Sequence, residues 1–492
     1  MKSSYLTAAA LAALAFQAPA FAQRTPSDHV RCDGRPDNVS AGETAARLIG
    51  AVTLLGIFAP PPEQADDSQR LAGAEGVAIC NAALDGESNE VRRAQLILAT
   101  AIHHIEAGDH DAALAEALRV ESDRPTLTGT PAYRYSLGIA GMEVQAMALL
   151  GAGRLEEARD KAFAMAAAAP YDLVAAARAL QYVRLSAEFG PAEETFYQNL
   201  VRLYPLAVLE RASHRQMAGD FRGSTEDYDL WMQFERSILD RPGMTTQAHA
   251  ALANALAGNI ERAAELAAQS RELLEAEPNS TSAPIASEIL DLYQIWKAAH
   301  EGRLADARLL FGARTTWIRP TAAAVSEVAR ILQQGAQPDQ LSGSLAGDPR
   351  RWVTEPLERR REALGSGKDR FGAIRGFFPQ ANYDRFAANV WRDGRSRYFG
   401  REDSDRLHAR FITVSRDGYG TPAGYALLLH SALTAQREGK SHFMLLPLEA
   451  NVGQNWVRFG NADDPNLIAP LTLDAAQVVA DLRPLISPPV RR

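Results

Sequence analysis

The stretch GAGRLEEARDKAFAMAAAAP, residues 151–170, decides the fold. It opens with a glycine turn, continues as charged residues among alanines, and stops at Pro170. Glycine adopts the left-handed conformation that ends a helix, and proline cannot continue the hydrogen-bond ladder of one. Ala158 follows Gly153 by five residues, where a methyl group lets a neighbouring helix approach closely. The stretch therefore predicts the second helix of a closely packed pair.

Related stretches recur along the chain. Alanine again follows a glycine by five residues at Ala113, Ala263 and Ala307, and Ser224 holds this position in a weaker copy. The turn glycines are spaced 29 to 45 residues apart, and a proline follows each of them. The glycines are Gly108, Gly153, Gly190, Gly219, Gly258 and Gly302, and the prolines are Pro125, Pro170, Pro205, Pro242, Pro278 and Pro320. Repetition at this period indicates stacked helix pairs.

This pattern resembles the tetratricopeptide (TPR) repeat, which combines a small residue in the first helix, a glycine turn with an aromatic residue, an alanine and a late proline. The small residue is supplied here by Ala101, Ala146, Ala212 and Ala251, and Phe221 or Leu155 stands in the aromatic position. The matching residues run from about 94 to 320. The resemblance implies a mainly α fold, with a TPR-like α-solenoid over residues 68–335.

In such repeats the first helix of each pair lines a concave face, which is a candidate peptide groove. Counting back from the turn glycines assigns to it Gln95, Leu98, Ile102, Glu143, Met147, Leu206, Leu209, Leu252, Leu292 and Trp296. The set is mostly apolar and lacks the lysine and asparagine clamp that some such domains use for a terminal carboxylate. An open groove of this kind suits an apolar or helical peptide. Alternatively, these side chains face neighbouring helices or a segment of the same chain.

The first 22 residues have the pattern of a secretory signal peptide. Lys2 precedes an apolar run from about Leu6 to Phe16, and Ala20-Phe21-Ala22 forms a cleavage site before Gln23. The pattern predicts export to the periplasm of a Gram-negative bacterium, with an uncleaved anchor as the alternative. No later segment is apolar for long enough to cross a bilayer.

Export changes the interpretation of Cys32 and Cys80. In an oxidising compartment a lone pair of cysteines predicts a disulfide, with two buried thiols as the alternative. The bond would tie the polar lead, residues 23–67, to the first of two helices expected near residues 68–84 and 90–107. Terminal units of a repeat array have an unpaired apolar face, so the lead would act as a cap.

The amino-acid composition changes after the repeats. Residues 336–405 are rich in arginine and predict a linker or a solvated helical segment. Residues 406–486 predict a small α/β domain in the order strand, helix, strand, strand, helix, at about 408–415, 421–438, 442–448, 455–460 and 473–485. This part resembles a domain of unknown function in small exported proteins and lipoproteins of alphaproteobacteria. The matching residues are Gly418, Tyr419, Thr421, Leu427 to Leu429, Gly439, Phe443, Asp474, Ala475 and Val478.

Candidate chemistry is sparse, and we predict no catalytic, cofactor or metal site. His103 and His104 point about 100° apart on a helix and cannot share one metal ion, and a turn separates His104 from His110. His430 lies in the apolar run LLLHSAL, as expected of a buried core residue. His442 and Asp417 form a candidate pair, but no motif places a nucleophile beside them.

Neither G-x-S-x-G nor S-x-x-K occurs, and GSGKDR at residues 365–370 departs from the phosphate-binding loop. The net charge of −8 argues against a nucleic-acid partner. The sequence favours a non-catalytic scaffold that binds another envelope protein or peptide. The alternatives are an envelope enzyme with a catalytic C-terminal domain, or a peripheral binder of anionic lipid or polysaccharide.

Overall fold

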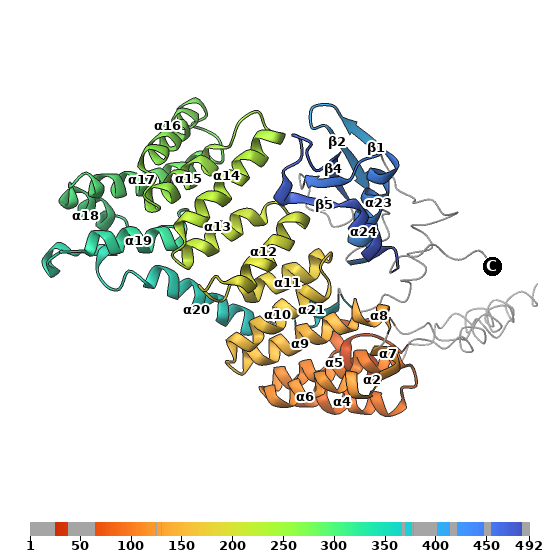
Figure 1. Ribbon diagram of the computed structural model, residues 1–492. Helices are drawn as coiled ribbons and strands as arrows, with labels where there is room; N and C mark the ends of the chain where they lie inside the picture. Colours follow the sequence, from red (N-terminus) through yellow and green to blue (C-terminus); the bar gives the residue numbers. More distant parts are fainter. Residues whose placement is uncertain are drawn as a thin grey trace, which may run out of the picture. The chain divides into compact units, whose positions relative to one another are not determined.

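The computed structural model describes residues 25–37, 64–123, 125–128, 130–366, 370–375, 377, 401–413, 421–446 and 454–484. The predicted signal peptide and Gly418 and Tyr419 lie outside these ranges. The protein is mainly helical, with a small antiparallel sheet near its C-terminus (Figure 1). No helix in the described ranges is long and apolar enough to cross a membrane. The chain divides into two compact units, Met1–Leu127 and Thr128–Arg492.

The first unit is a small helical bundle. Its elements are α2 (Asp28–Asp33), the 3-10 turn η2 (Asp67–Gln69), α4 (Gly73–Gly86), α5 (Glu90–Ala107) and α6 (His110–Asp123). Helix α5 packs between α4 and α6, and α2 packs on α4 and α5. The disulfide between Cys32 and Cys80 joins α2 to α4, which confirms the predicted pairing. Helix α5 has the bounds predicted from the sequence. The other predicted helix, 68–84, is divided in the structure, because its first residues form η2 and α4 begins only at Gly73.

The second unit opens with a series of helices. They are α8 (Pro131–Arg134), α9 (Leu137–Gly151), α10 (Leu155–Ala168), α11 (Leu173–Val183), α12 (Pro191–Leu203), α13 (Ala207–Met217), α14 (Phe221–Ile238), α15 (Met244–Leu256), α16 (Ile260–Ala276), α17 (Ala283–His300) and α18 (Leu304–Ala313). The short helix α7 (Pro125–Thr128) spans the boundary between the units. Consecutive helices pack in pairs, α9 with α10, α13 with α14, α15 with α16 and α17 with α18.

Glycine forms the turn inside each of these pairs. Gly153 has φ 75°, and Arg154 N donates to Leu149 O over 2.9 Å, so the left-handed glycine closes the end of α9. The equivalent turns at Gly108, Gly219, Gly258 and Gly302 have φ between 81° and 86°. Gly190 differs, since it lies at the N-cap of α12 with φ −133°. The connection between α11 and α12 therefore lacks the left-handed glycine turn of the other pairs.

The small residues predicted at helix crossings are buried. The predicted alanines and the serine at these positions are all 0% exposed: Ala101, Ala113, Ala146, Ala158, Ala212, Ser224, Ala251, Ala263 and Ala307. Side chains no larger than these let paired helices pack closely. The prolines then follow the second helices, as Pro170 follows α10 and Pro278 follows α16. Both features were predictable from the sequence.

A matched pair of substitutions tests this packing. Ala263 is fully buried in α16, whereas the next residue, Ala264, is exposed. We expect Ala263→Leu to lower the free energy of unfolding of the second unit by about 1–3 kcal/mol, because the extra atoms have no space. Ala264→Leu should change it by less than about 0.5 kcal/mol. Urea denaturation followed by circular dichroism measures both, and equal effects would contradict the packing role.

The chain after the pairs folds back on them. Helix α19 (Ala322–Gln333) contacts α13, α15 and α17, which are first helices of their pairs. Two 3-10 turns, η3 (Pro338–Gln340) and η4 (Gly343–Leu345), lead to α20 (Arg351–Gly365), which contacts α19 and α9. Helix α21 (Arg370–Arg375) also contacts α9, and Arg361 Nε donates to Leu185 O over 3.0 Å. The described part of the arginine-rich segment thus contains helices rather than only a linker.

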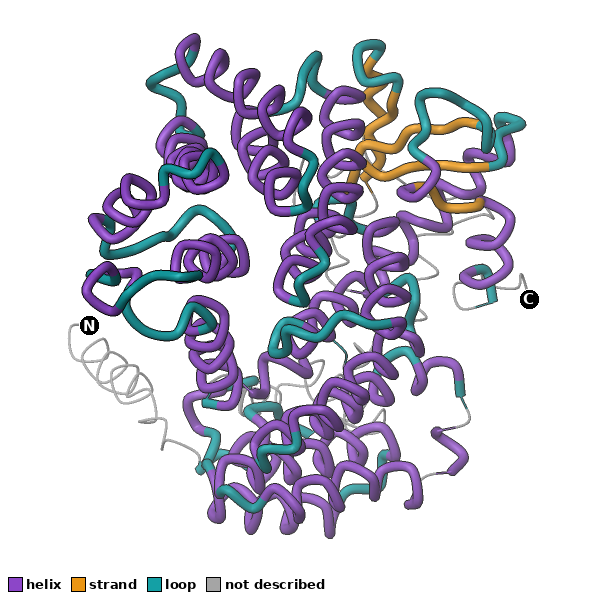
Figure 2. Tube along the Cα trace, turned by 60° about the vertical axis from the view of Figure 1, so that its left-hand side comes forward, coloured by secondary structure: helices purple, strands orange, loops and turns teal. Residues whose placement is uncertain are grey.

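The strands gather in one sheet, shown in orange in Figure 2. The strand order is β1-β2-β4-β3-β5, and every pairing is antiparallel. The elements are β1 (Arg401–Ser404), β2 (Ala409–Thr413), α23 (Thr421–Arg437), β3 (His442–Leu446), β4 (Gln454–Gly460), η6 (Ala469–Leu471), β5 (Thr472–Asp474) and α24 (Ala475–Leu482). The predicted order of strands and helices from β2 to α24 is present. Strands β1 and β5 were not predicted.

The sheet domain packs on the middle of the helical series. Helix α23 contacts α11, and β3 and η6 contact α12. Leu203, at the end of α12, belongs to the same buried cluster as Phe443 and Val457 of the sheet. The Tyr171 hydroxyl donates to Asp481 Oδ2 over 2.8 Å. The C-terminal domain is therefore part of the second unit rather than a separate body.

Candidate functional site

The residues predicted to line a peptide groove differ in exposure. Leu98, Ile102 and Leu292 are 0% exposed, and Glu143, Gln95, Leu252 and Trp296 are also buried. Leu252, Leu292 and Trp296 belong to one core cluster with Val325 and Val328 of α19. Met147 and Leu209 are partly buried, and Leu206 is 38% exposed. Most of this set is therefore buried within the protein, and Leu252, Leu292 and Trp296 pack in the same cluster as α19.

Helix α19 covers the part of this face formed by α13, α15 and α17, and it can do so because it is amphipathic. Its buried residues, Ala324, Val325, Val328, Ala329 and Leu332, recur at helical spacing along one side. The Thr321 side chain caps the helix by accepting from Ala324 N, and it also bonds Gln216 of α13. The predicted array, residues 68–335, includes this helix, but the repeat pattern itself runs only to about Pro320 and does not predict that α19 packs on the first helices. The apolar spacing within residues 322–333 was the signal that could have identified it.

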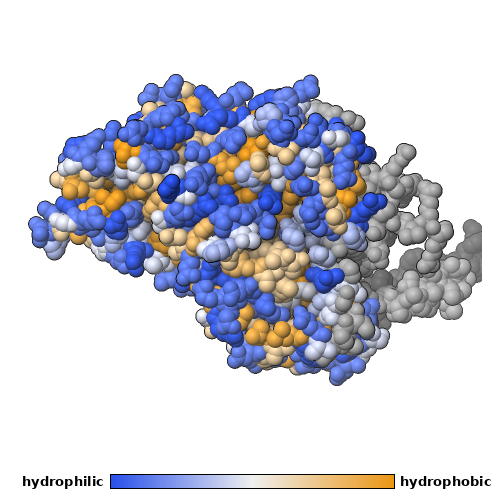
Figure 3. Space-filling view, viewed as in Figure 1, coloured by the Kyte–Doolittle hydropathy of each residue, from blue (hydrophilic) through white to orange (hydrophobic). Residues whose placement is uncertain are grey.

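A different groove is open to solvent between α10, α11 and α12. It has a volume of about 240 Å³ and is lined by Phe163, Ala166, Ala167, Ala169, Pro170, Ala176, Ala192, Thr195, Phe196, Asn199, Leu200 and Leu203. Pale orange colours mark the surface near these helices in Figure 3, between bluer areas. The groove includes the C-terminal half of the stretch that decides the fold. We refer to it as the α10–α12 groove.

The lining of the α10–α12 groove is almost entirely apolar. Alanine methyl groups from α10, α11 and α12 form much of it, and Phe163 meets Phe196 edge to face with ring centroids 6.0 Å apart. The polar side chains of the lining are Thr195 and Asn199, both exposed. Among its lining residues there is no lysine, arginine, aspartate or glutamate. The groove can therefore bury apolar surface, but it offers no charge to a ligand.

A buried ion pair helps to hold the two sides of this groove together. Arg159 of α10 bonds Glu193 of α12, and their side chains are 3% and 7% exposed. Glu193 also accepts from Gly190 N over 2.9 Å, at the start of α12. Arg159 is further paired with Glu156 and Glu188. The pair fixes α10 against α12, and with it the width of the groove.

Buried acids with raised pKa values lie elsewhere in the helical series. Burial raises the pKa of Glu143 to about 7, although Arg178 and the Tyr182 hydroxyl act in the opposite direction. Burial likewise raises the pKa of Asp227 to about 6, against the lowering effect of Arg211 and Arg215. Neither acid lines the α10–α12 groove. Their hydrogen bonds and ion pairs connect helices, as when Tyr182 of α11 donates to Glu143 of α9 over 3.2 Å.

The histidines singled out in the sequence contact neighbouring residues of the fold and do not gather into one site. His103 is fully buried, with Nε2 2.8 Å from Cys32 O and Nδ1 2.9 Å from Glu106 Oε2. Its ring thus supports the disulfide, whose two sulfurs are not free to bind a metal. His430 is 3% exposed, and burial lowers its pKa to about 4. His442 Nδ1 lies 2.8 Å from Ser441 Oγ, and its proposed partner Asp417 lies outside the described ranges.

The carboxylate of Glu106 makes the first unit sensitive to acid. Burial acts to raise its pKa, but the hydrogen bond with His103 and the charge of Arg70 outweigh this effect and lower the pKa to about 2. A lowered pKa in the folded state gives stability that is present above the unfolded value of 4.5 and is lost as pH falls towards 2.

We expect Glu106→Gln to be less stable than the wild type at pH 7. The difference in stability between the two proteins should shrink as pH falls towards 2, where Glu106 loses its charge in the wild type. Hydrogen exchange of α4 and α5, measured between pH 7 and pH 2.5 with correction for the intrinsic exchange rate, tests this. A difference from wild type that is constant with pH would contradict the electrostatic role of Glu106.

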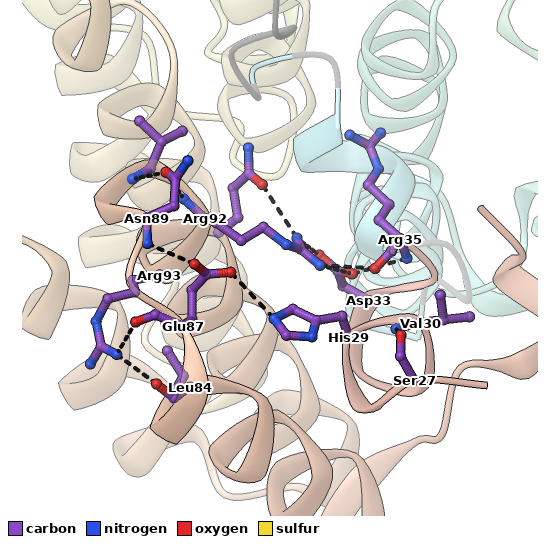
Figure 4. Close-up of polar contacts among 12 residues, drawn as sticks. Ser27, His29, Val30, Asp33, Arg35, Leu84, Glu87, Asn89, Arg92 and Arg93 are labelled. Carbon is purple, nitrogen blue, oxygen red and sulfur yellow. Dashed lines mark hydrogen bonds and ion pairs between the residues drawn. The ribbon is translucent and has the colours of Figure 1, made fainter. Parts of the chain in front are cut away.

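A second polar cluster, shown in Figure 4, anchors the N-terminal helix. Arg92 Nη1 lies 2.5 Å from Asp33 Oδ2, and Nη2 lies 2.9 Å from Oδ1. The side chains of this bidentate pair are 2% and 1% exposed. Arg92 also donates to Arg35 O over 2.9 Å. This pair fixes α2 against α5, and the disulfide fixes α2 against α4.

These features must be interpreted from the structure itself. Comparison of the chain with protein-family models, with curated proteins and with solved structures finds no match.

Proposed function

We propose that this chain is an exported helical-repeat scaffold that binds an apolar helical segment of another envelope protein in the α10–α12 groove. The observation that carries the proposal is the chemistry of that groove, which is open, concave and apolar. Exposed apolar concavities are typical of sites for helical peptides, which bury their apolar face in such grooves. The proposal assigns no catalytic step to the protein.

The repeats support a TPR-like solenoid as the framework. Left-handed glycines at the turns and buried small residues at the crossings occur in the pairs that the sequence pattern identified. Such arrays bind partners on extended helical surfaces. In this chain α19 contacts the first helices α13, α15 and α17. A partner would therefore use the surface made by α10, α11 and α12.

The lining favours a helix over an acidic tail. Small alanine side chains allow the backbone of a bound helix to approach closely, within the 8–10 Å typical of packed helices. The aromatic rings of Phe163 and Phe196 and the side chains of Leu200 and Leu203 offer apolar contact area. An acidic tail would find no cation among the described lining residues. The ligand is thus an amphipathic helix that presents leucine-like side chains.

Export is a further part of the proposal. The N-terminal pattern, with the disulfide between Cys32 and Cys80, supports an oxidising compartment such as the periplasm. Direct measurement of the processed N-terminus tests this part of the proposal. Mass spectrometry of the chain recovered from a periplasmic fraction should give a start near Gln23 or Arg24. An intact Met1 would contradict export by cleavage.

Binding can be tested with a fluorescent model peptide. A leucine–lysine peptide of about 18 residues, or five helical turns, should bind when its leucines lie on one face. A scrambled peptide of the same composition should bind at least tenfold more weakly, because it has the same charge but no apolar face. Fluorescence anisotropy measures both affinities, and equal binding of the two peptides would contradict the proposal.

The chain offers a matched pair of variants for the same assay. Ala167 lines the groove, whereas Ala168 is exposed beside it and does not line the groove. We expect Ala167→Asp to weaken binding at least tenfold, since a charge would be buried under the peptide. Ala168→Asp adds the same charge at the same helix end and should leave the affinity within about twofold. Equal losses from both variants would indicate non-specific electrostatics.

A further inference from the structure

We infer that the first unit holds a zinc site formed by His29, Asp37 and Glu87. Each of these residues offers one ligand atom, and the three atoms lie within 4.8 Å of one another. His29 belongs to α2, Asp37 follows it, and Glu87 lies directly after α4. Metal binding would therefore join the N-terminal segment to the bundle, close to the disulfide that already does so.

Two of the three ligand atoms are buried but form no hydrogen bond. His29 Nε2 and Glu87 Oε2 lie 3.3 Å apart, and their side chains are 15% and 4% exposed. This contact is an ion pair when His29 is protonated, and neither atom makes a hydrogen bond. Buried polar atoms are normally hydrogen-bonded, and a cation bound between these two would satisfy both. Figure 4 shows the His29 ring and the Glu87 carboxylate directed towards each other.

The spacing of these two atoms fits a tetrahedral metal. In protein sites zinc lies about 2.0–2.1 Å from histidine nitrogen and about 2.0–2.2 Å from carboxylate oxygen. Two ligands at the corners of such a tetrahedron are about 1.6 bond lengths apart, which is roughly 3.3 Å. The 3.3 Å separation of His29 Nε2 and Glu87 Oε2 matches this edge. One metal ion can thus contact both atoms without a rearrangement of the backbone.

The other oxygen of Glu87 is already held in place. Asn89 N donates to Glu87 Oε1 over 2.6 Å, which fixes the carboxylate and leaves Oε2 directed at His29. Partners of this kind orient the ligands of metal sites. Arg93 is the neighbouring cation, and its Nη1 is bound to the carbonyl oxygens of Leu84 and Glu87. Its charge lowers the affinity of the site, and the two carboxylates offset this effect.

The ligand set selects the metal. A histidine nitrogen with two carboxylate oxygens suits zinc and similar transition ions, whereas calcium and magnesium prefer oxygen alone. Asp37 is exposed and can move towards the other two ligands, and water completes the fourth position. This set could not be predicted from the sequence, because His29 and Glu87 are far apart in the chain and no metal-binding spacing connects them.

Zinc titration of the metal-free, oxidised full-length mature chain tests the site. Isothermal titration calorimetry should show one zinc ion bound per chain at micromolar protein, with no competition from millimolar magnesium. Glu87→Gln preserves the bond from Asn89 and should weaken zinc binding at least tenfold. Asp37→Asn changes an exposed side chain and should weaken it as well, which keeps the test valid if the Glu87 variant unfolds.

His29→Gln and His104→Gln form the matched comparison. His104 is a partly exposed histidine of the same unit, 4.0 Å from Asp109 Oδ2, and belongs to neither group of potential metal ligands. We expect loss of binding for His29→Gln and unchanged binding for His104→Gln. Cobalt substitution should give the intense visible absorption of a tetrahedral ion in the wild type only. Absence of stoichiometric binding, or an equal loss in both histidine variants, would overturn the assignment.

Discussion

Asp33→Ala is expected to lower the free energy of unfolding of the first unit by about 3–5 kcal/mol, which is a large fraction of the stability of a small bundle. The substitution leaves the guanidinium of Arg92 buried, 2% exposed, without its carboxylate partner. An unpaired buried charge costs far more than the net contribution of the intact pair. Hydrogen exchange of α4 and α5 in the full chain measures the loss locally.

Two further variants identify the cause of this loss. Arg92→Met, combined with Asp33→Ala, removes both charges and should recover most of the stability. Asp28→Ala removes an aspartate of the same helix, whose ion pair with Arg31 spans 3.7 Å and is partly exposed. It should cost less than about 1 kcal/mol. Similar losses for Asp28→Ala and Asp33→Ala would contradict the role given to the buried pair.

Arg458→Ala is the second substitution with a large expected effect, and it acts on the second unit. Arg458 is 2% exposed and donates to Leu407 O, Asn466 O and Ser237 O. The first two acceptors belong to the sheet domain, and Ser237 lies near the end of α14. Hydrogen bonds from a charged donor contribute about 1.5–3 kcal/mol each. We expect a loss of at least about 3 kcal/mol and faster hydrogen exchange in the sheet.

Arg437→Ala is the control for Arg458→Ala. Arg437 belongs to the same domain and is exposed, with a hydrogen bond of 2.7 Å to Thr434 Oγ1. Its removal should cost less than about 1 kcal/mol. Thermal unfolding and hydrogen exchange of β3 and β4 report both variants. Unchanged protection of the sheet in Arg458→Ala would show that this arginine does not fasten the domain to the helices.

Local patterns predicted the helix pairs well because each pair is decided within a short stretch. Gly153 and Pro170 act on their own backbone, and Ala158 needs only a neighbouring helix to be buried. The disulfide also followed from local arguments, since the chain has two cysteines and a predicted export signal. These features depend on the residues within a short stretch of sequence rather than on contacts between distant parts of the chain.

Features that depend on distant contacts could not be predicted in the same way. The contact of α19 with α13, α15 and α17 decides which first-helix positions are solvent-exposed, and no repeat pattern contains this information. Strand β5 has three residues and exists through its pairing with β3. Arg458 carries no local sign that its partners include Ser237. The α10–α12 groove likewise arises from three helices, only one of which lies in the opening stretch.

Site-specific photo-crosslinking most directly tests whether the α10–α12 groove binds a partner. A photoreactive amino acid is placed at Ala167 or Thr195 within the groove, and at Ala168 or Gln198 beside it, in intact cells that naturally produce the chain. We predict one defined protein adduct from each groove position and none from the neighbouring positions. Adducts that form equally at all four positions, or at none of them, would contradict a binding role for the groove.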